Sequence, residues 1–314
     1  MKRNHLAILA GALAIGCMAW SGSALADGVL MGPGALPAAE RAVLMAQVRD
    51  ARAANPSSFE RLAAAAARLP GLDAQKRGRY PAVVPMLRAL GADALLPMLE
   101  AIALDAPSRG RVSDEGWTAW RAGLVETVGA LRDARSAPVL EALLDGPNAD
   151  FMIVQAAAGA YGKLETDAVA ARLIGLSRAG GAKQSAVLSG LGHCRRVAVA
   201  QRLAEVLGSA SDEATVRLAA HALGDIGSAW AWSTPQVTHP QEQDAVRETA
   251  ARALIAAVAR HRGETRGKLI SAVLVVDHAA TLSMIEAHKQ GAGPDAKAGL
   301  DELARRFASS PFRR

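Results

Sequence analysis

The chain has 314 residues, with 36 Lys and Arg against 30 Asp and Glu, and it contains only five Trp, two Tyr and four Phe. So few aromatic residues argue against a β-sandwich core and a sugar-binding aromatic platform, because both depend on large flat side chains. Hydrophobic residues make up 51% of the chain and no block of like charge occurs, which argues against a low-complexity disordered chain.

The first 26 residues have the pattern of an export signal. Lys2 and Arg3 precede an apolar run from Leu6 to Trp20, and small residues follow at Ala24 and Ala26. This order of basic, apolar and small residues is typical of a signal peptide. We therefore predict a signal peptide over residues 1–26, cleaved after Ala26, and a periplasmic or secreted mature protein.

Two alternatives to cleavage after Ala26 remain open. The apolar run could be kept as a transmembrane anchor, but about 15 residues are short for the ~30 Å core of a bilayer. Cys17 could be the lipid-bearing residue of a lipoprotein, although Ala14 stands where such junctions prefer Leu. We predict no transmembrane span in the mature chain.

The mature chain carries a formal charge of +4, because removal of the signal takes Lys2 and Arg3 away from a total of +6. Cys194 is then its only thiol, so no internal disulfide can form. The mild basic excess suits solubility or weak contact with anionic envelope polymers, and nucleic acid is not an expected partner of an exported protein.

A repeat of 30 to 38 residues runs through the mature chain. Each unit has apolar residues five, four and one positions before a glycine, which is one stripe of an α-helix. The anchoring glycines are Gly91, Gly129, Gly162, Gly192 and Gly224. A second apolar helix follows each turn, and we expect the glycines to end the first helices with positive φ. Neither helix can cover its own stripe, so neighbouring units must stack.

The segments Gly123–Gly146 and Ala214–Ala229 resemble HEAT-like repeats, particularly the short type also found in phycobilisome lyases. The resemblance covers residues 80–229 clearly and 242–290 more loosely. It implies an all-α fold, an α-solenoid of stacked helix pairs. It implies little about chemistry, since such repeats serve many unrelated tasks.

The predicted organisation is a signal peptide over 1–26, a helical N-terminal extension over 27–79, the repeat solenoid over 80–290, and a C-terminal cap and tail over 291–314. The extension contains a helix pair, Pro37–Ala54 and Asn55–Leu69. Pro294–Phe307 is the expected closing helix, with a polar outer face that a terminal cap needs.

Two insertions interrupt the repeat, Asp105–Gly116 and Ser228–Gln243. Because of the second insertion, we expect the second helix of that unit to begin late, at Asp244–Arg260. All four tryptophans of the mature chain lie beside these insertions: Trp117, Trp120, Trp230 and Trp232. Loop insertions in solenoids commonly build binding faces, and Trp is enriched in interface hot spots. We predict these residues as partner-binding candidates with Arg109 and Arg111 as rim charges. The competing interpretation is that each Trp pair packs under its own insertion.

The residues that suggest chemistry mostly fall on structural repeat positions. Cys194 takes a position that is apolar in the other units, so we predict a buried thiol. His193 and His221 fall at variable positions and are expected on the surface. No metal-ligand spacing, phosphate loop or nucleophile elbow occurs. We predict no cofactor, no metal and no enzymatic activity.

The predicted function is therefore a non-catalytic scaffold that binds another protein of the cell envelope. The first alternative is a protein that binds a small molecule or an anionic glycan or lipid through a basic strip at Arg262–Lys268. The second is a repeat-type enzyme related to bilin lyases, which the resemblance alone suggests.

Overall fold

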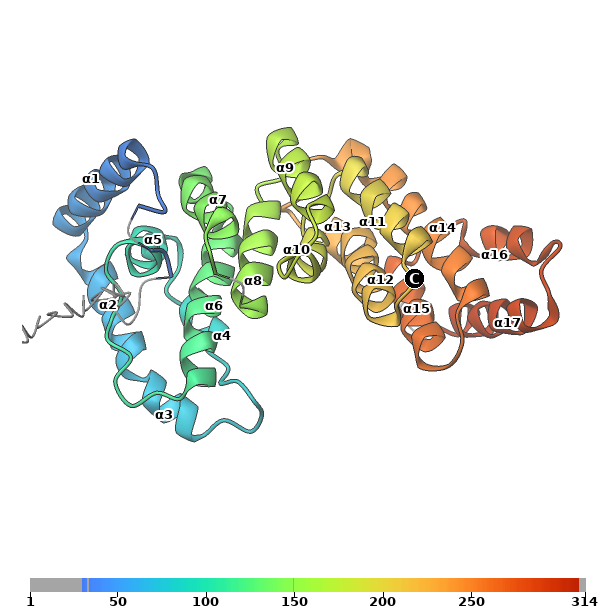
Figure 1. Cartoon of the computed structure of the whole chain (residues 1–314), viewed down its shortest axis with the longest axis horizontal. Coiled ribbons are helices and arrows are strands. Elements are labelled where there is room, and N and C mark those ends of the chain that lie inside the picture. The colour runs from blue at the N-terminus through green and yellow to red at the C-terminus, as the bar shows by residue number, and fades with distance from the viewer. Residues whose placement is uncertain (1–29, 33, 149, 311–314) are drawn as a thin grey trace, which may run out of the picture.

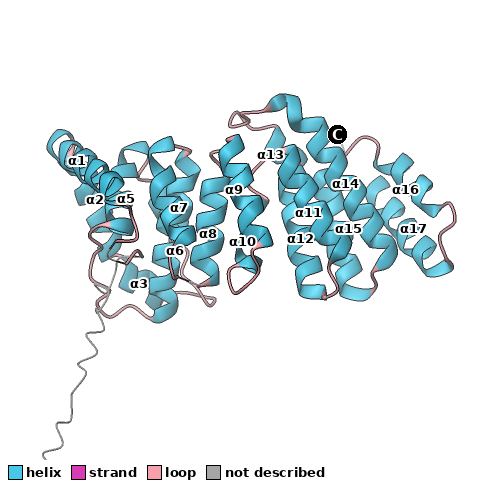
Figure 2. Cartoon of the chain, turned by 45° about the horizontal axis from the view of Figure 1, so that its top comes forward, coloured by secondary structure: helices cyan, strands magenta, loops and turns pink. Residues whose placement is uncertain are grey.

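The computed structural model describes residues 30–32, 34–148 and 150–310 (Figure 1). Within these ranges the regular elements are all helices, and they stack side by side into one elongated body (Figures 1 and 2). The chain is an α-solenoid of helix pairs, as the repeat predicted. The predicted signal peptide over residues 1–26 and both alternatives to its cleavage lie outside the described residues.

Two rows of helices build the solenoid. The helices of the first row pack against one another in chain order: α4 (Val84–Arg88), α6 (Asp114–Leu131), α8 (Phe151–Gly162), α10 (Gln184–Leu191), α12 (Glu213–Gly227) and α15 (Gly263–Val276). Each is followed by its partner in the second row: α5 (Leu95–Ala103), α7 (Ala137–Asp145), α9 (Asp167–Arg178), α11 (Val197–Ser209), α14 (Gln243–Arg260) and α16 (Thr281–Lys289). Short 3₁₀ turns precede three of the partners: Ala92–Ala94, Ala134–Ser136 and Pro240–Glu242.

Helices also cover both ends of the stack. At the N-terminal end lie α1 (Ala38–Ala54), α2 (Pro56–Ala67) and α3 (Leu69–Ala74), and at the other end α17 (Pro294–Ala308) packs on α14, α15 and α16. Leu300, Leu303 and Phe307 bury one face of α17. The opposite face of α17 is polar, so this helix closes the apolar core that α15 and α16 would leave open.

The anchoring glycines serve helix packing rather than helix termination. Of the five, only Gly91 has positive φ, at 77°. A Cβ added to Gly129 would lie 2.4 Å from Ala160 on α8, and one added to Gly192 would lie 2.9 Å from the carbonyl oxygen of Ala222 on α12. The expected positive-φ role is therefore wrong for four of the five. At Gly129 and Gly192 the neighbouring first-row helix approaches too closely for a side chain.

Positive φ occurs instead at three non-glycine residues. They are Arg132 at 53°, Glu165 at 55° and Asp277 at 44°. Arg132 and Glu165 both lie three residues after an anchoring glycine, in the turn between the two helices of a unit. A non-glycine residue in this region costs roughly 1–2 kcal/mol, so contacts elsewhere must offset the cost.

The first insertion is fixed to the N-terminal extension through Asp73. Its carboxylate accepts hydrogen bonds from the Ser113 backbone N–H and hydroxyl, each at 2.8 Å, and from Lys76 at 2.8 Å. These donors, Lys76 first, lower the pKa of Asp73 to about 2. Ser113 is also the N-cap of α6, accepting from Gly116 N–H, so this contact sets where the long helix α6 begins.

In the described part of the chain, no helix is both long and apolar enough to span a bilayer.

The close approach predicts opposite effects for two glycine-to-alanine changes. Gly129→Ala should lower the free energy of unfolding by about 1–3 kcal/mol, because the new methyl group overlaps Ala160. Gly175→Ala, inside α9 with nothing within 4 Å of its added Cβ, should raise it by roughly 0.5–1 kcal/mol. Urea unfolding followed by circular dichroism measures both, and equal effects would contradict the packing role of Gly129.

Candidate functional site

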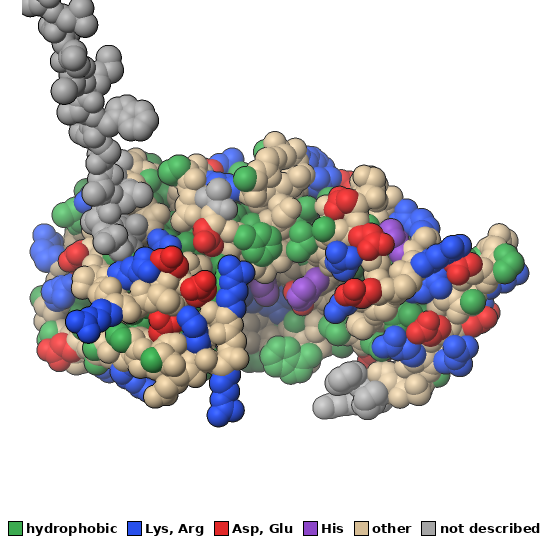
Figure 3. All heavy atoms as spheres, turned by 60° about the horizontal axis from the view of Figure 1, so that its bottom comes forward, with side chains coloured by type: hydrophobic (Ala, Val, Ile, Leu, Met, Phe, Trp, Pro, Cys, Tyr) green, Lys and Arg blue, Asp and Glu red, His purple; other side chains and the backbone are tan. Residues whose placement is uncertain are grey.

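A groove of about 280 Å³ lies on the face formed by the first-row helices. Its lining comes from the ends of α4, α6, α8, α10 and α12, and from the second insertion, which contains the short helix α13 (Ala229–Trp232). Figure 3 shows this face hollowed near its middle, with histidine and hydrophobic side chains around the hollow. We define the central groove by Arg132, Lys163, His193, Asp225, Trp230 and Gln236.

The repeat itself places three of these side chains in line. Lys163, His193 and Asp225 each follow an anchoring glycine directly. Because the glycines hold α8, α10 and α12 close together, the residues after them form a continuous row across the stack. The His193 ring lies on the backbone of α8, where a Cβ added to Gly159 would be 2.7 Å from its Cδ2.

Lys163 is a half-buried cation in this row. Loss of hydration lowers its pKa to about 8, and the positive charges of Arg88 and Arg132 act in the same direction, while Glu126 opposes them. His193 beside it has a pKa lowered to about 4, first by desolvation and then by the charge of Lys163. At neutral pH the lysine is therefore mostly charged and this imidazole is neutral.

Asp225, which lines the groove, forms an ion pair with His221. His221 Nδ1 lies 3.2 Å from Asp225 Oδ2, one helical turn away on α12. The hydrogen bond to this carboxylate raises the pKa of His221 to about 9, so the pair is charged on both sides at pH 7. The negative charge of Asp225 is thus already balanced by the positive charge of His221.

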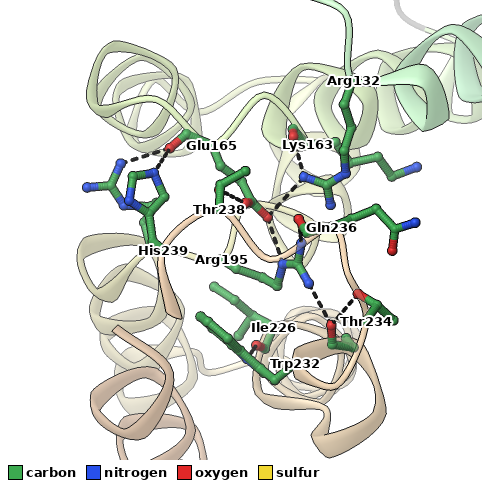
Figure 4. Close-up of polar contacts among 12 residues, drawn as sticks. Arg132, Lys163, Glu165, Arg195, Ile226, Trp232, Thr234, Gln236, Thr238 and His239 are labelled. Atoms are coloured by element: carbon green, nitrogen blue, oxygen red, sulfur yellow. Dashed lines mark hydrogen bonds and ion pairs between the residues drawn. The ribbon is translucent and has the colours of Figure 1, made fainter. Parts of the chain in front are cut away.

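Arg195 attaches the second insertion to the solenoid (Figure 4). Its Nη1 donates to the carbonyl of Ala231 at 2.6 Å, its Nη2 donates to that of Gln236 at 2.8 Å, and its guanidinium lies 5.6 Å from the ring centre of Trp232. The side chain of Arg195 is almost fully buried. One guanidinium therefore holds the backbone of the second insertion at two points after Trp230.

Glu165 is the acceptor at the centre of this network (Figure 4). It is 1% exposed, and its carboxylate accepts from Arg195 Nε at 2.7 Å and from the Thr238 hydroxyl, with Arg132 Nη1 3.4 Å away. A buried carboxylate is stable only when paired and hydrogen-bonded, and here residues from two units and the insertion supply the pairing.

The main chain of Glu165 is equally well fixed. Its carbonyl accepts from Arg196 Nη1 at 2.8 Å and from His239 Nε2 at 3.0 Å. Arg196 also pairs with Glu242 at 2.8 Å, at the start of α14. These contacts offset the positive φ of Glu165 and join three turns into one rigid unit.

The four predicted tryptophans do not form one surface. Trp117 and Trp120 are 5% and 1% exposed in the core of α6, and Trp232 is 5% exposed with its indole N–H donating to the Ile226 carbonyl at 2.7 Å. These three are packing residues, which corrects their expected place on a binding face. Trp230 alone among the four is exposed, at 77%.

The predicted rim charges lie away from the central groove. Arg109 pairs with Asp114 at 2.5 Å and donates to the Val112 carbonyl, so it stabilises the first insertion. Arg111 is exposed in the same insertion. Neither residue lines the groove beside Trp230, because the two insertions leave the solenoid at different units.

Cys194 is fully buried and its pKa is raised to about 12 by desolvation, as expected for a core thiol. His193 and His221 are exposed, as predicted. Among the described residues, no three His, Cys, Asp or Glu side chains are grouped so that they could hold a metal ion.

Sequence reasoning missed Lys163, Glu165 and Arg195 as parts of one site. The available signal was a charged residue three positions after successive anchoring glycines: Arg132, Glu165 and Arg195. When opposite charges alternate at one repeat position, residues of neighbouring units can form ion pairs. Here Glu165 pairs with both Arg132 and Arg195.

No protein-family model matches the chain, and no curated protein matches its sequence. Among solved structures, it is similar to human deoxyhypusine hydroxylase in complex with glycerol, with 16% sequence identity over 81% of this chain and 98% of that chain. The TM-score is 0.28.

This comparison corrects one expectation. The sequence predicts a protein that is not an enzyme, whereas the solved structure to which the chain is similar is that of an enzyme, a hydroxylase. That finding points against the prediction, and we withdraw it. A TM-score of 0.28 assigns no reaction to this chain.

The network predicts a large cost for removing Arg195. Arg195→Ala should lower the free energy of unfolding by about 3–5 kcal/mol, because it leaves the buried Glu165 carboxylate without its main partner. Arg252→Ala, which removes an exposed ion pair with Glu248 on α14, should change it by less than about 0.5 kcal/mol. Urea unfolding measures both changes, and similar values would contradict the proposed anchoring by Arg195.

Proposed function

We propose that this protein binds a segment of another protein of the cell envelope, and that the central groove is its binding surface. The observation that carries the proposal is the exposed indole of Trp230 on a backbone held by Arg195. A large aromatic side chain kept in water by a rigid support loses little entropy on binding, which is typical of an interface hot spot.

The solenoid supports this proposal through its shape. Stacked helix pairs present a long continuous surface rather than a closed pocket, and the groove crosses the ends of five first-row helices. The proposed location rests on the signal-peptide pattern of residues 1–26, which lie outside the described part of the chain.

The first alternative, an anionic polymer held by the strip at Arg262–Lys268, is less well supported. Arg262 and Arg266 both pair with Asp295 of α17 at 2.9 Å, and Arg266 also donates to the His261 carbonyl. These charges hold the C-terminal cap to α15, so little of the strip is left for a polymer.

The proposal predicts a partner that depends on Trp230. Tagged mature protein should recover a protein from detergent-solubilised envelope, and Trp230→Ala should lose at least nine-tenths of it while unfolding at the same urea concentration. Because apolar contacts are not screened by salt, recovery should survive high salt. Mass spectrometry identifies the captured protein, and Phe151→Ala, an exposed aromatic at the far end of α8, is the matched control.

Recovery of glycan or lipid alone, lost at high salt, would contradict the proposal and favour the polymer-binding alternative. Equal recovery by Trp230→Ala and the unchanged protein would show that the central groove is not the binding surface.

A further inference from the structure

The charges around the central groove are paired except for one. The carboxylate in its lining and the two nearby each have a basic partner: Asp225 pairs with His221 at 3.2 Å, Glu126 with Arg88 at 2.9 Å, and Glu165 with Arg195 at 2.7 Å. Arg132 shares Glu165 and donates to the Lys163 carbonyl at 2.7 Å. In the described part of the chain, no residue gives the Lys163 ammonium a hydrogen bond or an ion pair within 4 Å.

An unpaired ammonium in this position favours an anionic ligand. Lys163 is half-buried, so its charge has lost part of its hydration without gaining a carboxylate in return. A ligand carboxylate would compensate for the lost hydration. The attraction between it and the ammonium is stronger here than at a fully hydrated surface. The charge of Asp225 is already matched by His221, which leaves Lys163 as the charge in the groove that an anion can pair with.

Trp230 defines the second half of the subsite. It lines the same groove as Lys163, and its backbone is fixed on both sides. Ser228 caps α13 by accepting from the Ala231 N–H, and the Ser233 hydroxyl donates to the Trp230 carbonyl at 2.8 Å. The indole is therefore carried on a fixed backbone as an apolar surface of the same groove, suited to stack on an aromatic side chain.

The size of the groove limits what can fill it. At about 280 Å³ it falls just below the 300–1,000 Å³ typical of pockets for cofactors and drug-sized ligands. It is open across the row of helices, so a chain can enter and leave it. These dimensions suit one or two side chains of a passing peptide.

We propose that the central groove accepts an internal Asp or Glu of a partner protein at Lys163, with an aromatic side chain next to that acid stacked on Trp230. The inference rests on the proposed function and adds the chemistry of the segment that is bound. The partner is thus an acidic-aromatic peptide segment rather than a basic one.

Selection from a random twelve-residue peptide library displayed on phage tests the inference. Peptides chosen by the unchanged protein should share an acid adjacent to an aromatic residue. By fluorescence polarisation, Lys163→Glu should weaken a selected peptide at least ten-fold, and a peptide with Lys in place of the acid should regain binding to that variant. Lys163→Met removes the charge alone and should also weaken binding, whereas Lys268→Glu, an exposed lysine on α15 outside the groove, should not.

The outcomes separate the two proposals. Peptides that depend on Trp230 but share no acid, or that bind Lys163→Met as tightly as the unchanged protein, overturn the inference and leave the proposed function standing. The absence of any peptide that depends on Trp230 overturns both. Acidic peptides that lose affinity with Lys268→Glu rather than Lys163→Met would move the binding site to the basic strip and also overturn the inference.

Discussion

Close approach of the first-row helices sets the geometry of the solenoid. At Gly129 and Gly192 the neighbouring helix occupies the space that a side chain would need, so the distance between units is set by backbone contact. That distance brings the residues after the glycines into one row and allows charges in successive turns to pair. A larger residue at these positions would separate the units and break the row of side chains that forms the groove.

The second consequence of this spacing is the buried pair of Glu165 and Arg195. Glu165 comes from the turn after α8 and Arg195 from the turn after α10, and their contact at 2.7 Å requires the two units to be close. Arg195 then holds the backbone that carries Trp230. A packing constraint in the core is thus linked through one ion pair to an exposed aromatic side chain, and the candidate binding surface is rigid for that reason.

The sequence predicted the helix pairs, the insertions and the buried Cys194 well, because apolar spacing in a repeat reports directly on which face is covered. The sequence did not show which of Trp230 and Trp232 is buried. They are the same residue type two positions apart, and only the direction in which each points from α13 distinguishes them.

The role of the anchoring glycines was also predicted wrongly. Glycine recurs at one position of successive units, but a need for positive φ and a need for close packing leave the same pattern in the sequence. The ion-pair network was not predicted because its members lie 30 residues or more apart.

A photo-crosslinker in the central groove tests directly whether this face of the solenoid binds a partner protein. Benzoylphenylalanine in place of Gln236, which is exposed and lines the groove, leaves Trp230 and Lys163 intact. Irradiation of cells of the source organism should link this position to one envelope protein, and the same residue in place of Phe151 should give no such product. A partner linked at Phe151 and not at Gln236 would contradict the claim that this face of the solenoid is the binding surface.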